Sequence, residues 1–120
     1  MKLIYHPERE TITLAGVLYA LGDPVRLTIV TRLAVDGELT CGVAYPHPIA
    51  KSTLAHHLKL LREAGLIHVR QQGREYYNRL RSEDLDARFP GVLTTVIAAA
   101  PRDAVGYARS HASSAASDAL

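Results

Sequence analysis

The chain has 120 residues, with 14 Lys and Arg, 12 Asp and Glu, six His and one Cys. This length suits one domain that buries about two thirds of its unfolded surface. One cysteine cannot form a disulfide within the chain or supply a four-cysteine zinc site. Neither a signal peptide nor a stretch of about 18 apolar residues is visible, so we expect a cytoplasmic protein without membrane contact.

The net charge of +2 hides an uneven distribution. Residues 51–81 carry seven Lys and Arg against two Glu, whereas the rest of the chain has more acidic than basic residues. A local basic segment beside an acidic remainder favours a face that binds a polyanion, although such a cluster is often only solvated surface.

We expect a short polar N-terminal extension over 1–10, one domain over 11–100 and an Ala- and Ser-rich tail over 101–120 that is either a frayed helix or disordered. From Thr11 to Leu21, apolar residues recur every three or four positions, which is typical of a helix. This helix is apolar on more than one face, so it needs both its own core and a second subunit as partners.

Gly22, Asp23 and Pro24 predict a helix–turn–helix corner. Glycine suits the end of one helix, aspartate caps the next, and proline fits a first helical position. The second helix then continues to Leu33, with Gly37 after its end. Over 38–50 the two prolines limit any helix to one or two turns, which Thr40 can cap.

A third long helix is predicted from Lys51 to Ala64, closed by Gly65. The alternating segments 66–71 and 75–80 predict a hairpin with Gly73 in its turn. Ser82 is expected to cap the following segment, and an amphipathic helix follows near the end of the domain. The fold is therefore predicted to be mainly α with a small β-hairpin: a dimeric winged helix-turn-helix.

Three segments in this order resemble motifs of the ArsR/SmtB family of winged helix-turn-helix repressors. They are LGDPVRLTIV at 21–30, KSTLAHHLKLLREAGLI at 51–67 and GREYY at 73–77. The resemblance covers about residues 10–100. It implies a homodimeric transcriptional repressor that binds double-stranded DNA at an inverted-repeat operator and is released by an effector.

The resemblance identifies 51–64 as the recognition helix. Its outer face is small and polar, as entry into a major groove about 12 Å wide requires. His57 lies at the edge of the apolar stripe, which favours a packing role, and Arg26 and Arg32 are expected to make intramolecular contacts or to be solvated. The predicted DNA-binding residues are Lys51, Ser52, Thr53, Ala55, His56 and Lys59 in the helix, and Arg70 and Arg74 in the wing.

The family's first and last helices form its dimer interface, and the apolar patterns of both segments here favour the same use. The predicted interface residues are Ile12, Leu14, Leu18, Val92, Leu93, Val96 and Ile97.

The metal sensors of this family carry a Cys-x-Cys pair where this chain has Thr40, Cys41 and Gly42. We therefore expect no metal site and no cofactor, since a transition metal needs about four suitable ligands. Convergence of Cys41 with His6 and His47 is the remaining metal hypothesis, and Cys41 is otherwise a small buried residue or a redox-active thiol. The effector is a metal, a small molecule, a redox signal or none.

Two other classes of function remain to be compared. One is a winged-helix module that binds protein and not DNA, for which an acidic recognition face would be typical. The other is an enzyme, which the sequence disfavours because it shows no nucleophile motif, glycine-rich phosphate loop or paired carboxylates.

Overall fold

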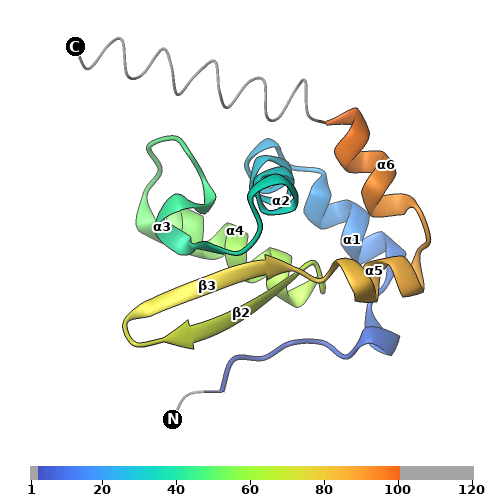
Figure 1. Cartoon of the computed structure of the whole chain (residues 1–120), viewed down its shortest axis with the longest axis horizontal. Helices are drawn as coiled ribbons and strands as arrows, with labels where there is room; N and C mark the ends of the chain where they lie inside the picture. The colour runs from blue at the N-terminus through green and yellow to red at the C-terminus, as the bar shows by residue number, and fades with distance from the viewer. Residues whose placement is uncertain (1–2, 101–120) are drawn as a thin grey trace.

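The computed structural model describes residues 3–100, so the tail predicted over 101–120 lies outside the described residues. A hairpin projects from a body of helices (Figure 1). The elements are η1 (Arg9–Thr11, a 3₁₀ turn), α1 (Leu14–Leu21), α2 (Pro24–Asp36), β1 (Leu39–Thr40), α3 (Cys41–Ala44), α4 (Lys51–Glu63), β2 (Ile67–Gln72), β3 (Glu75–Leu80), α5 (Ser82–Arg88) and α6 (Val92–Ala99).

α1 begins later than the apolar pattern predicts. Thr11 belongs to the 3₁₀ turn, and Thr13 caps the helix by accepting a hydrogen bond from the Gly16 amide at 3.1 Å. A threonine side chain that bonds the first free amides ends the extended segment and starts the helix at Leu14. Ser82 is likewise the first residue of α5 and not its cap, a position that Arg81 takes.

The predicted corner between α1 and α2 is confirmed. Asp23 Oδ1 accepts hydrogen bonds from the amides of Val25 at 2.8 Å and Arg26 at 3.1 Å, and Pro24 opens α2. The two helices bend by 101° at this corner. Among the described residues no single helix has the length and apolar character needed to cross a membrane, and only this bent pair passes that test together.

The predicted hairpin is present and gains a third strand. β2 and β3 pair antiparallel from Ile67 opposite Leu80 to the turn at Gly73. β1 pairs with the other edge of β3, with Leu39 opposite Asn78, so the strand order is β1-β3-β2. The sheet therefore joins the segment before α3 directly to the base of the wing.

The core lies where α1, α2, α4 and the base of the sheet meet. Ile12 and Leu93 belong to it, with 2% and 5% of their surface exposed. These two residues were predicted to form a dimer interface, but their side chains are covered within their own protomer and offer no surface to a partner. Apolar periodicity identified both as buried and could not say against what.

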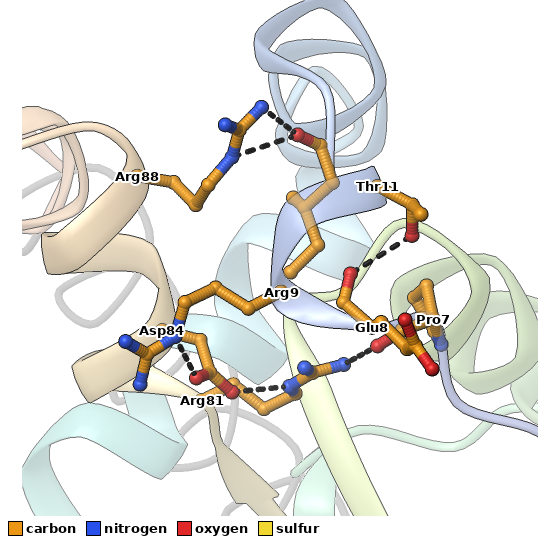
Figure 2. Close-up of polar contacts among 8 residues, drawn as sticks. Pro7, Glu8, Arg9, Thr11, Arg81, Asp84 and Arg88 are labelled. Carbon is orange, nitrogen blue, oxygen red and sulfur yellow. Dashed lines mark hydrogen bonds and ion pairs between the residues drawn. The ribbon is translucent and has the colours of Figure 1, made fainter.

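The N-terminal segment is tied to the domain by a polar network around Asp84 (Figure 2). Arg9 and Arg81 both donate to this carboxylate, at 2.7 and 2.9 Å. Arg81 also donates to the Pro7 carbonyl at 2.7 Å. The two hydrogen bonds from arginine lower the pKa of Asp84, with the bond from Arg9 as the larger cause. The segment before α1 is therefore fixed against α5 and the end of the wing.

Candidate nucleic-acid interface

One side of α4 packs in the core, and the other side carries the residues predicted to contact DNA. Leu58 and Leu61 are buried, while the opposite side carries an exposed row. Ala50 at the N-cap makes no side-chain hydrogen bond, so the first amides of the helix remain available to phosphate oxygens. All six recognition-helix residues predicted to contact DNA are exposed: Lys51, Ser52, Thr53, Ala55, His56 and Lys59.

His57 anchors α4 to the corner between α1 and α2. Its Nδ1 accepts a hydrogen bond from Arg26 at 3.2 Å and lies 3.9 Å from Asp23 Oδ1. Arg26 is itself buried, and it donates to the Ala20 carbonyl at 2.7 Å. The packing role predicted for His57 and the intramolecular role predicted for Arg26 are confirmed. The neighbouring His56 is left exposed on the outer face.

The two arginines predicted in the wing differ in their surroundings. Arg74 lies exposed in the turn between β2 and β3. Arg70 makes a paired ionic contact with Glu38, at 3.0 and 2.7 Å, and stacks over the Tyr77 ring at 4.4 Å. The hydrogen bond from Arg70 lowers the pKa of Glu38, which keeps this carboxylate ionised. Arg74 is therefore the freer cation for phosphate.

Sequence reasoning missed two residues in this region. Glu38 was not identified as the partner of Arg70 because 32 positions separate them and no local motif joins them. Arg79 is exposed on β3, and it entered the sequence reasoning only through the basic charge count. The alternation of β3 is the signal that could have found it, since Tyr77 and Arg79 share a face of the sheet.

The residues of the metal hypothesis do not assemble a site. Over residues 3–100, no three His, Cys, Asp or Glu side chains gather closely enough to hold a metal ion. Cys41 is half-buried and accepts a hydrogen bond from Asn78 Nδ2 at 3.3 Å. His6 stacks on His68, with ring centroids 4.2 Å apart, and this contact does not include Cys41.

The predicted dimer residues fall into three groups. Ile12 and Leu93 are core, as described above. Leu14 and Leu18 of α1 are 42% and 49% exposed. Val92, Val96 and Ile97 of α6 are half-buried, and the last two pack against the core.

Comparison with known proteins identifies the fold and its use. A family model described as a helix-turn-helix domain matches residues 21–70. A helix-turn-helix transcriptional regulator of Bacillus subtilis, YceK, is 42% identical over 84 residues, which is 68% of this chain and 84% of that protein. The transcriptional repressor SmtB of Mycobacterium tuberculosis is 33% identical, over 82% of this chain and 71% of its own length.

Solved structures agree with these relatives. The crystal structure of an ArsR family transcriptional regulator superposes with a TM-score of 0.57 at 28% identity, over 68% of this chain and 85% of that one. The repressor BigR of Xylella fastidiosa gives a TM-score of 0.52 at 31% identity, over 63% and 85% of the two chains. With its winged helix-turn-helix, its exposed recognition face and these relatives, the chain belongs to the ArsR/SmtB family of DNA-binding transcriptional regulators, which are not enzymes.

Proposed function

We propose that two copies of this chain form a dimer that represses transcription by binding an inverted-repeat operator. The observation that carries this proposal is the face of α4, where small and basic side chains are exposed beside the wing while the opposite side is fixed in the core. A two-fold dimer would place two such helices in successive major grooves, about one helical turn of DNA apart.

Apolar exposure supports a dimer built on α1 and α6. Leu14, Leu18 and Tyr19 are 42%, 49% and 70% exposed on one short helix. Figure 1 shows α1 and α6 on the side of the molecule away from the tip of the hairpin. A two-fold contact there leaves the wings at the outer ends of the assembly, where each can reach the DNA backbone beside its half-site.

In this arrangement the residues of α4 divide the work of recognition. Ser52, Ala55 and His56 face base edges in the major groove, because they are small or carry a ring nitrogen that bonds to bases. Lys51, Thr53 and Lys59 contact phosphates and set affinity and register. Arg74 adds a phosphate contact from the wing, and Arg70 remains with Glu38 unless the DNA displaces that carboxylate.

The proposal includes release by an effector. Repression would follow from competition with RNA polymerase for the promoter, and the effector would lower DNA affinity through a coupling of about 1–3 kcal/mol. Because the chain lacks the family's Cys-x-Cys pair, the effector we propose is a small molecule and not a metal. The dimer would act in the cytoplasm, where the chromosome lies.

A titration with duplex DNA tests the proposal. Fluorescence anisotropy with the region upstream of its own gene, at moderate salt, should show binding about a thousandfold tighter than to random duplex. His56→Ala should bind the operator and single-base variants of it with more nearly equal affinity, whereas Val35→Ala on the exposed side of α2 should behave as wild type. Equal affinity of the wild type for every duplex would refute sequence-specific repression and favour a protein-binding module.

A further inference from the structure

A cavity of about 370 Å³ lies between the N-terminal segment, α4 and the sheet. Its walls include Leu3 and Ile4 from the segment, Leu58 from α4 and Val69 from β2. This volume is in the range of small-molecule sites, which are mostly apolar with a few polar groups that orient the ligand. The neighbouring elements are held in place by direct contacts: Arg62 donates to the Tyr5 carbonyl, and the Val69 amide donates to His6 Nε2 at 2.9 Å.

The charge of the cavity favours an anion. Among the described residues that line it, Lys59 and Arg62 carry positive charge and none is Asp or Glu. The two lie three positions apart on α4, so their side chains share one face of the helix. No ion pair joins Lys59 to another of the residues 3–100.

The wall of the cavity also holds a buried polar group with spare capacity. Asn78 lines the cavity and is fully buried, and its Nδ2 donates to the Leu39 carbonyl and to Cys41 Sγ. Its Oδ1 has no hydrogen-bond partner among the described residues. Buried amide oxygens are normally satisfied, and this one can bind only a donor such as a hydroxyl group or a water molecule, so it does not contribute to carboxylate binding.

We propose that this cavity binds a small organic acid, with its apolar body between the N-terminal segment and the sheet and its carboxylate at Lys59 and Arg62. The regulatory part of this inference rests on the proposed function, because Lys59 also belongs to the DNA-binding face. A bound carboxylate takes Lys59 away from phosphate and adds negative charge beside the DNA backbone. The acid therefore lowers DNA affinity, and by linkage DNA lowers the affinity for the acid by the same factor.

Cys41 provides a built-in reporter of occupancy, because it lines the cavity and is the single cysteine in the chain. Its alkylation by N-ethylmaleimide is followed by mass spectrometry with decanoate as the probe. Decanoate should slow the alkylation at least fivefold in a saturable manner, and decanol should protect far less because it lacks the charge. No protection at millimolar decanoate, or equal protection by decanol, would overturn the proposal.

Two valines give matched variants. Val69→Phe fills the cavity, whereas Val43→Phe makes the same change at a site on α3 that is 50% exposed and outside the cavity. Protection by decanoate should be lost in the first and kept in the second. Lys59→Gln, a change at an exposed position, should weaken decanoate binding in calorimetry at least fivefold even if Val69→Phe does not fold. Unchanged binding in Lys59→Gln would overturn the proposed carboxylate contact.

A second experiment separates this inference from the proposed function. In the operator titration, decanoate should raise the dissociation constant of wild type at least tenfold and leave that of Val69→Phe unchanged. If the ligand-free protein shows no specific DNA binding, the proposed function fails while the occupancy result stands. If specific DNA binding is intact and decanoate neither binds nor releases it, the cavity proposal fails alone.

Discussion

Arg26 connects the turn after α1 with the recognition helix. It donates to the Ala20 carbonyl at 2.7 Å and the Tyr19 carbonyl at 3.3 Å, which are among the last carbonyls of α1; the Tyr19 carbonyl also accepts from the Gly22 amide. It also lies over the Tyr19 ring and contacts His57 on α4. The orientation of the predicted DNA-binding face therefore depends on a buried residue outside that face.

Arg74 supports a prediction about salt. Arg74→Ala should weaken binding to all DNA sequences, because a phosphate contact carries no base information. Each phosphate contact contributes about 0.9 to the slope of log affinity against log salt, so the slope should flatten by about one unit. Anisotropy titrations at several salt concentrations, on operator and random duplex, measure both effects.

Arg70→Ala is the matched control for this measurement. Arg70 is on the same wing but is paired with Glu38, so its loss should change the salt slope much less. A larger effect from Arg70 than from Arg74 would mean that DNA displaces Glu38, and it would contradict the assignment of Arg74 as the main contact of the wing.

Single residues of the site were predictable where one helix decides their environment. The 3.6-residue period of a helix was enough to predict that His56 is exposed and that His57 is packed, because each depends only on the face of α4 on which it lies. The ion pair between Arg70 and Glu38 could not be predicted from the sequence, since it depends on a contact between segments 32 positions apart. The placement of Ile12 failed for a similar reason, because periodicity does not say which partner covers an apolar face.

At the scale of elements, the junction between α4 and β2 depends on Gly65. Its φ of +88° is in the left-handed region, and a Cβ there would lie 2.6 Å from Ile12 side-chain atoms in the core. Gly65→Ala should therefore lower the free energy of unfolding by about 1–2 kcal/mol, because alanine disfavours the left-handed conformation. Overpacking against Ile12 should lower it by about 1–3 kcal/mol more. Urea unfolding measures this change in the free energy of unfolding.

Gly73→Ala measures the cost of the left-handed backbone conformation without the steric clash. Gly73 has a φ of +63°, and nothing lies within 4 Å of a Cβ added there. Its loss of stability should be clearly smaller than that of Gly65→Ala. Equal losses would mean that Ile12 moves aside at little cost, and the steric argument would be wrong.

The long helices and the hairpin were predictable as elements, whereas the third strand and the helical state of α5 were not. Asp23, Pro24 and Gly73 are strong local signals for a cap, a helix start and a turn. β1 has two residues, which is too short for any alternation of polar and apolar positions to be seen. β1 forms because Leu39 and Thr40 pair with the free edge of β3, which lies far along the chain.

The contact between the N-terminal segment and β2 predicts a pH dependence. Burial lowers the pKa of His6 below its ordinary 6.5, and the positive charges of His68, Arg62 and Arg81 act in the same direction. Burial also lowers the pKa of His68. Below pH 6.5 the unfolded chain thus binds more protons than the folded one. The contribution of the two neutral histidines to the free energy of unfolding is complete above about pH 6.5. It is lost as the pH falls through their lowered pKa values in the folded protein.

His6→Gln tests this dependence, because glutamine can still accept from the Val69 amide and does not titrate. Wild type should lose more free energy of unfolding between about pH 7.5 and about pH 5.5 than the variant does. Identical losses in both proteins would place the pH sensitivity in groups other than His6.

At the scale of the whole molecule, the proposed dimer predicts a change of assembly. Leu18→Glu places a carboxylate on the exposed apolar side of α1, where Leu18 is 49% exposed in the protomer. The protomer should fold normally, but an unpaired charge in an interface costs several kcal/mol. Sedimentation at micromolar concentration should show monomers, and operator affinity should fall because one half-site alone is bound.

Val35→Glu is the control for that change. Val35 is 60% exposed on α2 and is not among the residues of the proposed interface, so this variant should remain a dimer with wild-type operator affinity. A dimer that survives Leu18→Glu would require another face for assembly.

The two-residue strand β1 has a mechanical consequence for the wing. In the middle of β3, Tyr77 and Asn78 pair with strands on both sides, whereas Glu75 and Tyr76 near the tip are paired only with β2. The outer part of the hairpin, beyond Tyr77, is therefore held by fewer strands and is expected to bend more easily than the part that pairs with β1. Arg74 can then follow the local shape of a DNA backbone while the middle of β3 stays packed against α3.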